Sequence, residues 1–589
     1  MKKIIRIVPV ICFAILLTAL VSCKNEKETV QSQQTEPAPD KVTTGEITTE
    51  EVTTEEVTTE DAITEDVFVH PGILHTQESF EYMKYAVENK ISPNYDTYQV
   101  LKINGLSNAS WNPRAVETVI RGGNGDNVSK LYIDVARAYQ CALIWKIEGS
   151  KPHGEAACRI LNAWSSTLKS IGGNADRYLA SGLFGYQLAN TSEIMRDHPL
   201  FKKEQMQKML LEVFYYPMNE RFLIGNEYGY DHNDAYIQNY WANWDLCNMA
   251  SAVAIGIFCD NEEVYNVGIQ YFKHGKGNGS IYNAIPFVFE DGTAQWQESG
   301  RDQGHTNLGL GLMACVCEMA WNQGDDLYSM ADNRLMKAAE YIARYNNGYD
   351  VSFSQYEWGS GKNGTVNYHT GISGAGRGEV RPIWSMIYNH YVNRKGLSMP
   401  NVEERLKMLE YEYGAGGHAT TYDQPGWGTL TFYGNKGNTE ATVIAGDMEE
   451  GIYIIKSVHT GKVLTVSEVN GDTGVVAQRG EGTSYSAFWE VIGTGDGEYF
   501  IKNVKTGLYL EVKDGSHESG AVIQTSGKSG KISQKFGILL NNTTFRIISS
   551  GSGKAIDILD WSGEDDATMI QWRFLNGNNQ KWIFIKQNE

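Results

Sequence analysis

The C-terminal part of this chain contains an internal repeat, which limits how that part can fold. Three tripeptides that end at Gly461, Gly507 and Gly553 stand 46 residues apart. Each unit consists of short alternating apolar and polar runs between glycine-rich turns, a pattern that predicts strands. Because one short unit cannot bury its own apolar face, three copies predict one all-β, pseudo-threefold domain at residues 446–587. Two further series keep this period to within one residue: Gln478, Gln524 and Gln571, and Trp489, Phe536 and Trp582.

The units resemble ricin-type β-trefoil lectin repeats, whose hallmark is Gln-x-Trp near the end of each unit. The third unit keeps the whole motif as Gln580, Lys581 and Trp582, whereas the second ends in Phe536 and the first lacks the glutamine. The resemblance implies a carbohydrate-binding trefoil in which a carboxylate bonds sugar hydroxyls and an aromatic face covers the apolar side of the ring.

The acidic position of this sugar pocket differs among the three units. The matching residues are Thr465, Glu511 and Asp557, and Thr465 departs from the pattern, so a first pocket is not expected. The third unit is the best candidate. The residues that the resemblance implies for sugar binding are Asp557, Trp572, Asn578 and Gln580, with Glu511 in the second unit.

The larger part of the chain, residues 67–440, reads as helices. Apolar residues recur there at helical spacing, with loops rich in Gly, Asn and Tyr. Paired helices that each bury one face predict an all-α domain, an (α/α) toroid with its cleft lined by loops and helix ends. Residues 419–434 are expected to form short β-like pieces. The expected helices are 131–147, 154–171, 186–196, 203–216, 242–258, 262–275, the run after His305, 336–345 and 383–396.

Residues 297–305, read as QESGRDQGH, hold the strongest candidates for chemistry. If a helix begins at about Glu298, then Glu298, Arg301, Asp302 and His305 fall at i, i+3, i+4 and i+7, on one face. The run that follows is apolar nearly all round, which predicts a buried helix. Two acids, a cation and an imidazole on one face could transfer protons; the alternative is a solvated charged face.

Several stretches resemble the alginate-lyase-like superfamily of polysaccharide lyases, (α/α) toroids that act on uronic-acid polymers. They span most of residues 70–435. The resemblance implies cleavage of 4-linked uronic-acid polymers, alginate or glucuronan-like, and indicates the reaction class better than the sugar. The stretches are RGGNG from Arg121, ILNAWSSTL from Ile160, ANTSEIMRD from Ala189, NYWANWDLCNMA from Asn239, QESGRDQGH from Gln297, DDLYSMADNRLMKAAEYIARYN from Asp325 and RGEVRPIWSMIYNHY from Arg377.

The lyase reaction explains why these residue types are needed. A β-elimination removes the C5 proton beside the uronate carboxylate and expels the C4 oxygen. A neutraliser must therefore pair with the carboxylate, a base must take the proton, and an acid must protonate the leaving oxygen. The resemblance implies that Asn243 and Arg301 neutralise, that His305 neutralises or acts as base, and that Tyr356 is the acid. Tyr356 is also the base if the elimination is syn.

Other assignments remain open at the level of sequence. Tyr368 and Tyr240 are alternatives to Tyr356. Asn243 could instead cap the helix that follows it, and Arg301 could form a structural ion pair with Glu298 or Asp302. The expected substrate contacts are Glu298, Gln303, Asn239, Trp244, Tyr368 and Arg377.

Two other classes of function are compatible with the sequence. An (α/α) toroid glycoside hydrolase would use a carboxylate pair, joining Glu298 or Asp302 with a distant acid such as Asp234 or Glu357. A catalytically inactive surface protein would only bind glycans. Elimination leaves a C4=C5 double bond that absorbs ultraviolet light, whereas hydrolysis creates no chromophore, so absorbance separates the classes.

The N-terminus predicts export and anchoring. Residues 1–22 combine a basic start with a short apolar run and resemble a bacterial lipoprotein signal peptide in which Cys23 is lipidated. Residues 23–66 form an acidic Thr/Glu linker that is expected to be disordered. We therefore expect a lipid-anchored protein on the outer face of a bacterial membrane, or a secreted one.

The charge and the motifs limit the partners. The net charge of −20 disfavours nucleic acid. The expected partners are an anionic polysaccharide substrate, a glycan on the trefoil and the membrane through Cys23. No motif for a cofactor or a catalytic metal is present in the sequence, so none is expected.

Overall fold

The computed structural model describes residues 67–225, 232–414, 422–437, 440–443, 446–471, 473–480 and 485–587. They belong to one compact unit, Glu65–Glu589. The predicted signal peptide, the acidic linker and Cys23 lie outside the described residues, and the predicted domain boundaries stay predictions. Across the described segments, no helix is both long and apolar enough to cross a membrane.

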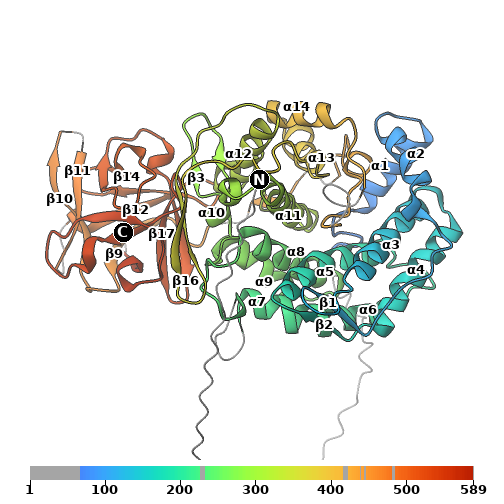
Figure 1. The fold of residues 1–589 in the computed structure, drawn as a ribbon. Coiled ribbons are helices and arrows are strands. Elements are labelled where there is room, and N and C mark those ends of the chain that lie inside the picture. Colours follow the sequence, from blue (N-terminus) through green and yellow to red (C-terminus); the bar gives the residue numbers. More distant parts are fainter. Residues whose placement is uncertain are drawn as a thin grey trace, which may run out of the picture. The chain divides into compact units, whose positions relative to one another are not determined.

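The helical part of the chain, blue to yellow in Figure 1, is built on a closed ring of helices. Each ring helix contacts the next one along the chain, and the last contacts the first, which confirms the predicted toroid. In order, the ring consists of α1 (Gln77–Glu88), α3 (Ser129–Glu148), α5 (Asp176–Ile194), α8 (Ala242–Phe258), α11 (Gln303–Asn322), α13 (Trp384–Tyr388) and α15 (Gly428–Thr431).

Outer helices pack against this ring. α4 packs on α3, α9 on α8 and α12 on α11, so each pair buries one shared face. Within α8 every residue except Trp244 is buried, as expected for a helix that is apolar nearly all round. The outer set includes α4 (Lys151–Thr167), α6 (Lys203–Met209), η2 (Leu210–Glu220), α9 (Glu262–His274), α12 (Met330–Asn346) and α14 (Pro400–Leu409).

Glycine permits the closest contact in the ring, between α5 and α8. A Cβ atom placed at Gly182 would lie 2.3 Å from Cys247 Sγ, and one at Gly185 would lie 2.2 Å from Ser251 Oγ. Neither distance is possible for real atoms. The two glycines therefore set the spacing of the helices that position the N-terminus of α8.

Residues 428–431 and 297–305 are among the segments in which the structure differs from the sequence-based expectation. Residues 428–431 form a short buried helix, α15, rather than a β-like piece. Residues 297–305 are not one helix: a 3-10 turn at Gln297–Gly300 is followed by Asp302 in an extended conformation (φ −170°), and α11 begins at Gln303. The Asp302 side chain accepts the backbone N–H of His305, so it starts the new helix as an N-cap.

The C-terminal part, orange to red in Figure 1, is the predicted trefoil. Its strands pair in the order β9–β12–β13–β16–β17–β20 and back to β9, which closes a barrel. Three hairpins, one per repeat, cap it. The barrel strands are β9 (Gly451–Ser457), β12 (Phe488–Gly493), β13 (Tyr499–Asn503), β16 (Phe536–Asn541), β17 (Thr544–Ser549) and β20 (Trp582–Lys586), and the hairpins are β10 (Val463–Asn470) with β11 (Thr473–Arg479), β14 (Tyr509–Val512) with β15 (Ile523–Ser526), and β18 (Ala555–Ile558) with β19 (Met569–Trp572).

The residues that carry the 46-residue period are structural. Trp489, Phe536 and Trp582 are 0% exposed and fill the core of the barrel. The Gln478 amide donates to two backbone oxygens in the hairpin turn of the third repeat, and the Gln571 amide does the same in the second. These two glutamines therefore tie the first repeat to the third and the third to the second, whereas Gln524 bonds to Glu511 in its own repeat.

A buried guanidinium joins the helical part to the trefoil. Arg334 on α12 is 0% exposed. It donates to the backbone oxygens of Ile285 and Pro286 in the helical part and, at 2.7 Å, to that of Ser550 in the trefoil. Val288 also donates its backbone N–H to the oxygen of Gly551 at 3.0 Å. Part of the contact between the trefoil and the helices is therefore made by these buried hydrogen bonds.

We expect Arg334→Met to lower the free energy of unfolding by about 3 kcal/mol or more, because three buried carbonyl oxygens lose a charged donor. Urea denaturation followed by far-ultraviolet circular dichroism measures the change. Arg344→Met on the same helix is the matched control: its side chain is 41% exposed and pairs with Asp291 at 3.5 Å, so a change within about 0.5 kcal/mol is expected. Equal losses in both variants would contradict the prediction.

Candidate functional site

The start of α11 holds an imidazole between an acid and a cation. Asp302 accepts hydrogen bonds from the backbone N–H and from Nδ1 of His305, both at 2.7 Å, and Arg301 Nη2 lies 3.1 Å from His305 Nε2. Because a guanidinium can only donate, Nδ1 carries the proton and Nε2 presents its lone pair. The His305 side chain is 42% exposed, so a substrate can reach it.

A fully buried carboxylate connects the starts of α8 and α11. Glu298 Oε1 accepts from Arg301 Nη1 at 2.8 Å and from Asn243 Nδ2 at 2.7 Å, while Oε2 accepts the backbone N–H of Asn243 at 3.3 Å. Burial raises the pKa of Glu298, and the charges of Arg301 and His305 oppose that rise. Glu298 is 0% exposed. The structure therefore gives it a supporting place instead of the predicted contact with substrate.

Asn243, the predicted neutraliser, is also buried. It occupies the second position of α8, after the N-cap residue Trp241, so it does not cap the helix. Its side chain is 1% exposed, and its Nδ2 is held by Glu298. Within the described ranges its Oδ1 has no hydrogen-bond partner. This geometry leaves Arg301, 25% exposed, as the more accessible group for a substrate carboxylate.

Three other predicted substrate contacts are engaged within the protein. Gln303 is 1% exposed, and its amide bonds to α12 and to a loop carbonyl. Asn239 Oδ1 accepts the backbone N–H of Gly361 at 2.7 Å and so anchors a hairpin turn. Arg377 donates to two backbone oxygens at the end of α12. These contacts shape the site; of the three residues only Gln303 is buried, and the substrate-binding roles of Asn239 and Arg377 stay predictions.

A hairpin of β6 (Tyr356–Ser360) and β7 (Thr365–His369) places aromatic rings beside Arg301. The His369 ring stacks on Trp241 with 5.6 Å between centroids and lies 4.5 Å from Trp358. The Arg301 guanidinium lies 5.0 Å over Trp241. Burial and, secondly, the charge of Arg301 lower the pKa of His369, so its imidazole is neutral at neutral pH.

Sequence reasoning missed Trp241, Trp358 and His369 as parts of one wall. A Cβ atom at Gly300 would lie 2.5 Å from His369, so the glycine in QESGRDQGH is what admits this ring. The alternation of aromatic residues in the hairpin was the available signal. It predicts a strand, but not which helix the strand faces.

Tyr356 lies on the inner side of the same hairpin. It is 7% exposed, and its hydroxyl donates to Asn278 Oδ1 at 3.1 Å. Burial raises its pKa well above the ordinary value, so the phenol stays protonated at neutral pH. Of the alternatives, Tyr368 is 52% exposed on β7, and the Tyr240 ring packs 4.7 Å from Trp244, another predicted substrate contact.

The third trefoil repeat contains a preorganised carboxylate. Asp557 is 5% exposed, and its two oxygens accept from Asn579 Nδ2 and Gln580 Nε2, both at 2.7 Å. Burial raises the pKa of Asp557 to about 6. Trp572, on the strand paired with that of Asp557, is 39% exposed. Asn578, the predicted sugar contact, is exposed, and its neighbour Asn579 holds the carboxylate.

The other two repeats differ as the sequence suggested. Thr465 is buried and donates to a backbone oxygen, so the first repeat lacks a carboxylate at this position. Glu511 accepts from Ser533 at 3.2 Å and from Gln524 at 3.3 Å. It lines a cavity of about 960 Å³ that Lys337 of α12 also borders. The second pocket therefore faces the helical part.

Comparison with protein families agrees with both parts of this description. Residues 88–351 match the alginate lyase family model, and residues 442–526 match that of the ricin-type β-trefoil lectin domain-like family. The chain thus carries an alginate lyase family domain followed by a ricin-type β-trefoil lectin domain, and both resemblances drawn from the motifs are confirmed. No curated protein matches the chain.

Solved structures match about a quarter of the chain. The designed threefold-symmetric protein ThreeFoil is 28% identical over 23% of this chain and 99% of its own, with a TM-score of 0.23. The exo-β-1,3-galactanase 1,3Gal43A from Clostridium thermocellum is 29% identical over 27% and 34%, with a TM-score of 0.22. The Polyporus squamosus lectin, bound to a sialylated epitope, is 25% identical over 24% and 50%, with a TM-score of 0.22.

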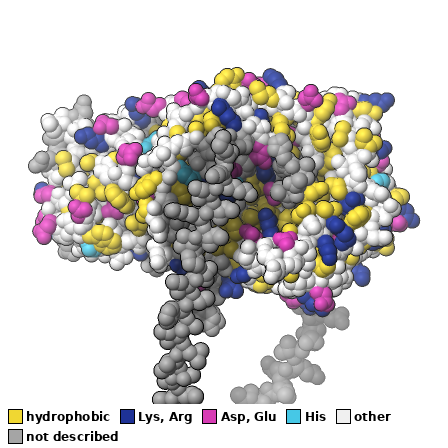
Figure 2. All heavy atoms as spheres, in the orientation of Figure 1, with side chains coloured by type: hydrophobic (Ala, Val, Ile, Leu, Met, Phe, Trp, Pro, Cys, Tyr) yellow, Lys and Arg dark blue, Asp and Glu magenta, His cyan; other side chains and the backbone are white. Residues whose placement is uncertain are grey.

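Figure 2 shows basic and acidic side chains interspersed on the visible face rather than gathered by sign. In the part of the chain that the structure describes, no three His, Cys, Asp or Glu side chains gather in a way that could hold a metal ion.

We expect the glycan affinity of the third trefoil pocket to fall as pH decreases through about 6, because protonation of Asp557 removes a charged acceptor for sugar hydroxyls. Isothermal titration of the full chain between pH 5 and 8, with the tightest ligand of a glycan panel, measures this. Asp557→Asn is the control and should bind weakly at every pH. A wild-type affinity that is constant across this range would contradict the prediction.

Proposed function

We propose that the helical domain is a polysaccharide lyase that cleaves 4-linked uronic-acid polymers by β-elimination while the trefoil binds glycan. The observation that carries the proposal is the exposed His305 imidazole, oriented by Asp302 and adjacent to Arg301, inside a domain that matches the alginate lyase family. Alginate and glucuronan-like polymers are the substrates to test first.

In this mechanism His305 is the base. Asp302 holds the proton on Nδ1 and stabilises the imidazolium that forms when Nε2 takes the C5 proton. Arg301 turns from His305 toward the substrate carboxylate and neutralises it, so that charge developing on the carboxylate oxygens is paired. Glu298 and Asn243 position Arg301 from the buried side.

Tyr356 is the proposed acid. Its raised pKa keeps the phenol protonated, as a donor of the proton to the departing C4 oxygen must be, and disfavours a base. The syn mechanism, which needs tyrosine as base, therefore receives less support. His369 is a neutral positioning group beside Arg301.

The hydrolase alternative receives less support from burial. A retaining or inverting hydrolase needs two carboxyl groups that flank the glycosidic bond. Glu298 is 0% exposed and hydrogen-bonded to Asn243 and Arg301, so it cannot approach such a bond in this conformation.

We also propose that the protein is anchored at the cell surface by lipidation of Cys23. Incorporation of radiolabelled palmitate into the wild-type protein, and its loss in Cys23→Ala, would test this location.

The reaction class is tested by incubating the protein with alginate, glucuronan and glycosaminoglycans. An increase in ultraviolet absorbance from the unsaturated product, in step with new reducing ends, is expected for at least one polymer. New reducing ends with flat absorbance would indicate a hydrolase. No product with retained binding would indicate a glycan-binding protein.

We expect His305→Ala to reduce kcat by about a thousandfold or more, and Asp302→Asn by about a hundredfold, because the latter misplaces the Nδ1 proton. Steady-state absorbance assays measure both. The matched control is His153→Ala on the outer helix α4, which should keep wild-type activity. Unchanged turnover in His305→Ala, with unchanged circular dichroism, would exclude this base.

A parallel comparison assigns the acid among the tyrosines. Tyr356→Phe is expected to lower kcat by about a hundredfold or more, while Tyr240→Phe and Tyr368→Phe change mainly KM. If Tyr240→Phe instead gave the larger loss of kcat, the acid would be Tyr240.

A further inference from the structure

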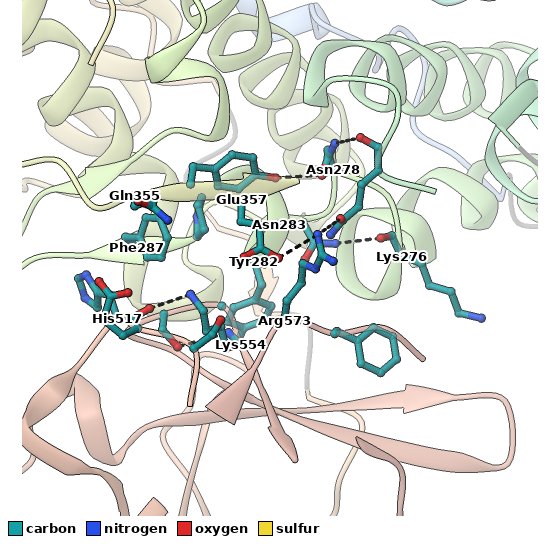
Figure 3. Close-up of a pocket in the computed structure, with 18 residues that line it drawn as sticks. Lys276, Asn278, Tyr282, Asn283, Phe287, Gln355, Glu357, His517, Lys554 and Arg573 are labelled. Carbon is teal, nitrogen blue, oxygen red and sulfur yellow. Dashed lines mark hydrogen bonds and ion pairs between the residues drawn. The ribbon is translucent and has the colours of Figure 1, made fainter. Parts of the chain in front are cut away.

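We propose that the third trefoil repeat supplies a cationic wall to a cavity beside Tyr356, and that this cavity binds an acidic sugar unit of the polymer. The inference rests on the proposed lyase function, because it names a second place where the same polymer is held. Figure 3 shows the cavity between helical and trefoil residues; its volume is about 130 Å³. One water molecule occupies roughly 10–15 Å³ of such a cavity, so the space is on the scale of one sugar unit.

The helical side of the cavity is polar. Tyr356 lines it, with its hydroxyl on Asn278, and Glu357 follows on the same strand. Gln238 Oε1 accepts the backbone N–H of Gly359 at 3.1 Å, so the hairpin is fixed to the loop before α8. A ligand here therefore lies against the strand that carries the proposed acid.

The trefoil side contributes Arg573. Its Nη1 pairs with Glu357 Oε1 at 3.1 Å and lies 3.4 Å from Gln238 Oε1. The charge of Arg573 is close enough to Tyr356 to oppose the rise in the pKa of that phenol. Among the residues that the structure describes, Arg573 Nε is buried without a hydrogen-bond partner. This N–H is a donor still to be satisfied.

Lys554 adds a second cation from the same repeat. Its Nζ donates to the backbone oxygen of His517 at 2.7 Å, an uncharged acceptor, and lies 4.9 Å from the Phe287 ring. Burial lowers the pKa of Lys554 to about 8, although Glu518 and Glu357 act in the opposite direction. The ammonium is therefore under-compensated, and an arriving carboxylate would stabilise it.

The trefoil fold itself does not require these cations. The hairpins of the three repeats have the same register, and their second strands end at the equivalent residues Arg479, Ser526 and Trp572. The residue that follows is Arg573 in the third repeat but a glycine, Gly480 or Gly527, in the other two. The position of Lys554 is Lys462 in the first repeat and Leu508 in the second. Arg573 is thus specific to the repeat that faces Tyr356.

The incomplete pairing of the cations around the cavity favours an anion. The cations that face it are Lys554 and Arg573, and the carboxylates are Glu357 and Glu518; Lys276 also borders the cavity, but its ammonium points away from the other labelled residues (Figure 3). Burial lowers the pKa of His517, so its ring adds no charge at neutral pH. Two cations thus face two carboxylates, so no excess of negative charge repels an anion here, despite the net charge of −20 of the chain. A uronate carboxylate fits it, because it can accept from Nε of Arg573, unpartnered within the described residues, and give the Lys554 ammonium a charged partner, which a neutral sugar cannot do.

We expect Arg573→Gln and Lys554→Gln each to raise KM for the polymer about tenfold, as for the loss of one charge-assisted hydrogen bond, with kcat changed less than twofold. Glu357→Gln is expected to lower KM, because it removes a competing carboxylate from Arg573. Lys462→Gln, at the equivalent position of the first repeat, is the matched control and should leave KM unchanged. Absorbance kinetics on the most active polymer measure all four.

A binding experiment separates this inference from the lyase proposal. Tetrasaccharides of mannuronate, guluronate and glucuronate are titrated into the His305→Ala chain, alone and combined with each variant, with thermal unfolding as a check on folding. Weaker binding in Lys554→Gln and tighter binding in Glu357→Gln would support the site even if no polymer yields an unsaturated product. If Arg573→Gln does not fold, these two variants are sufficient for the test. Turnover with unchanged KM in all variants, or no binding of any tetrasaccharide, would overturn it.

Discussion

The candidate site depends on one buried carboxylate. Glu298 receives hydrogen bonds from Asn243, at the start of α8, and from Arg301, just before α11. A buried charge is tolerated only when its lone pairs are satisfied, so the two helix starts cannot separate without exposing an unpaired ion. The N-terminus of α8 also favours a negative charge at that place. Arg301 is held in turn against His305, and the geometry of the polar cluster follows from this single group.

Much of the architecture could be predicted from local pattern. The apolar run 242–258 coincides with α8, and the aromatic residues at the 46-residue period, such as Trp489 and Trp582, are the barrel core. The helices α1, α2 (Asn94–Ile103) and α14 were not predicted, because about half of their positions are polar and only one face packs. Helical spacing also predicted one continuous helix through Asp302. The extended backbone of this residue separates a 3-10 turn from α11, and its side chain caps α11.

The candidate site was predictable in its residue types but not in its contacts. His305, Arg301 and Asp302 are close in sequence, so their spacing carried the information. Asn243 and Glu298 are 55 residues apart, and Gln238 and Arg573 are 335 apart. No local pattern relates such pairs. The motif alone predicted that His305, Glu298 and Gln303 all contact the substrate. In the structure His305 is exposed, whereas Glu298 and Gln303 are buried.

The buried contacts of Arg334 have a consequence for how the two sugar-handling domains work together. A lectin on a flexible linker raises the local concentration of any glycan within its reach, averaged over many distances. Here the linkage is a packed interface, so the separation between the Asp557 pocket and His305 has one value. A polymer gains affinity from both sites at once only if the segment between its two bound units spans that separation. Under the proposed function, the fixed separation would then select which bond is cleaved, by its distance along the polymer from the unit that the trefoil holds.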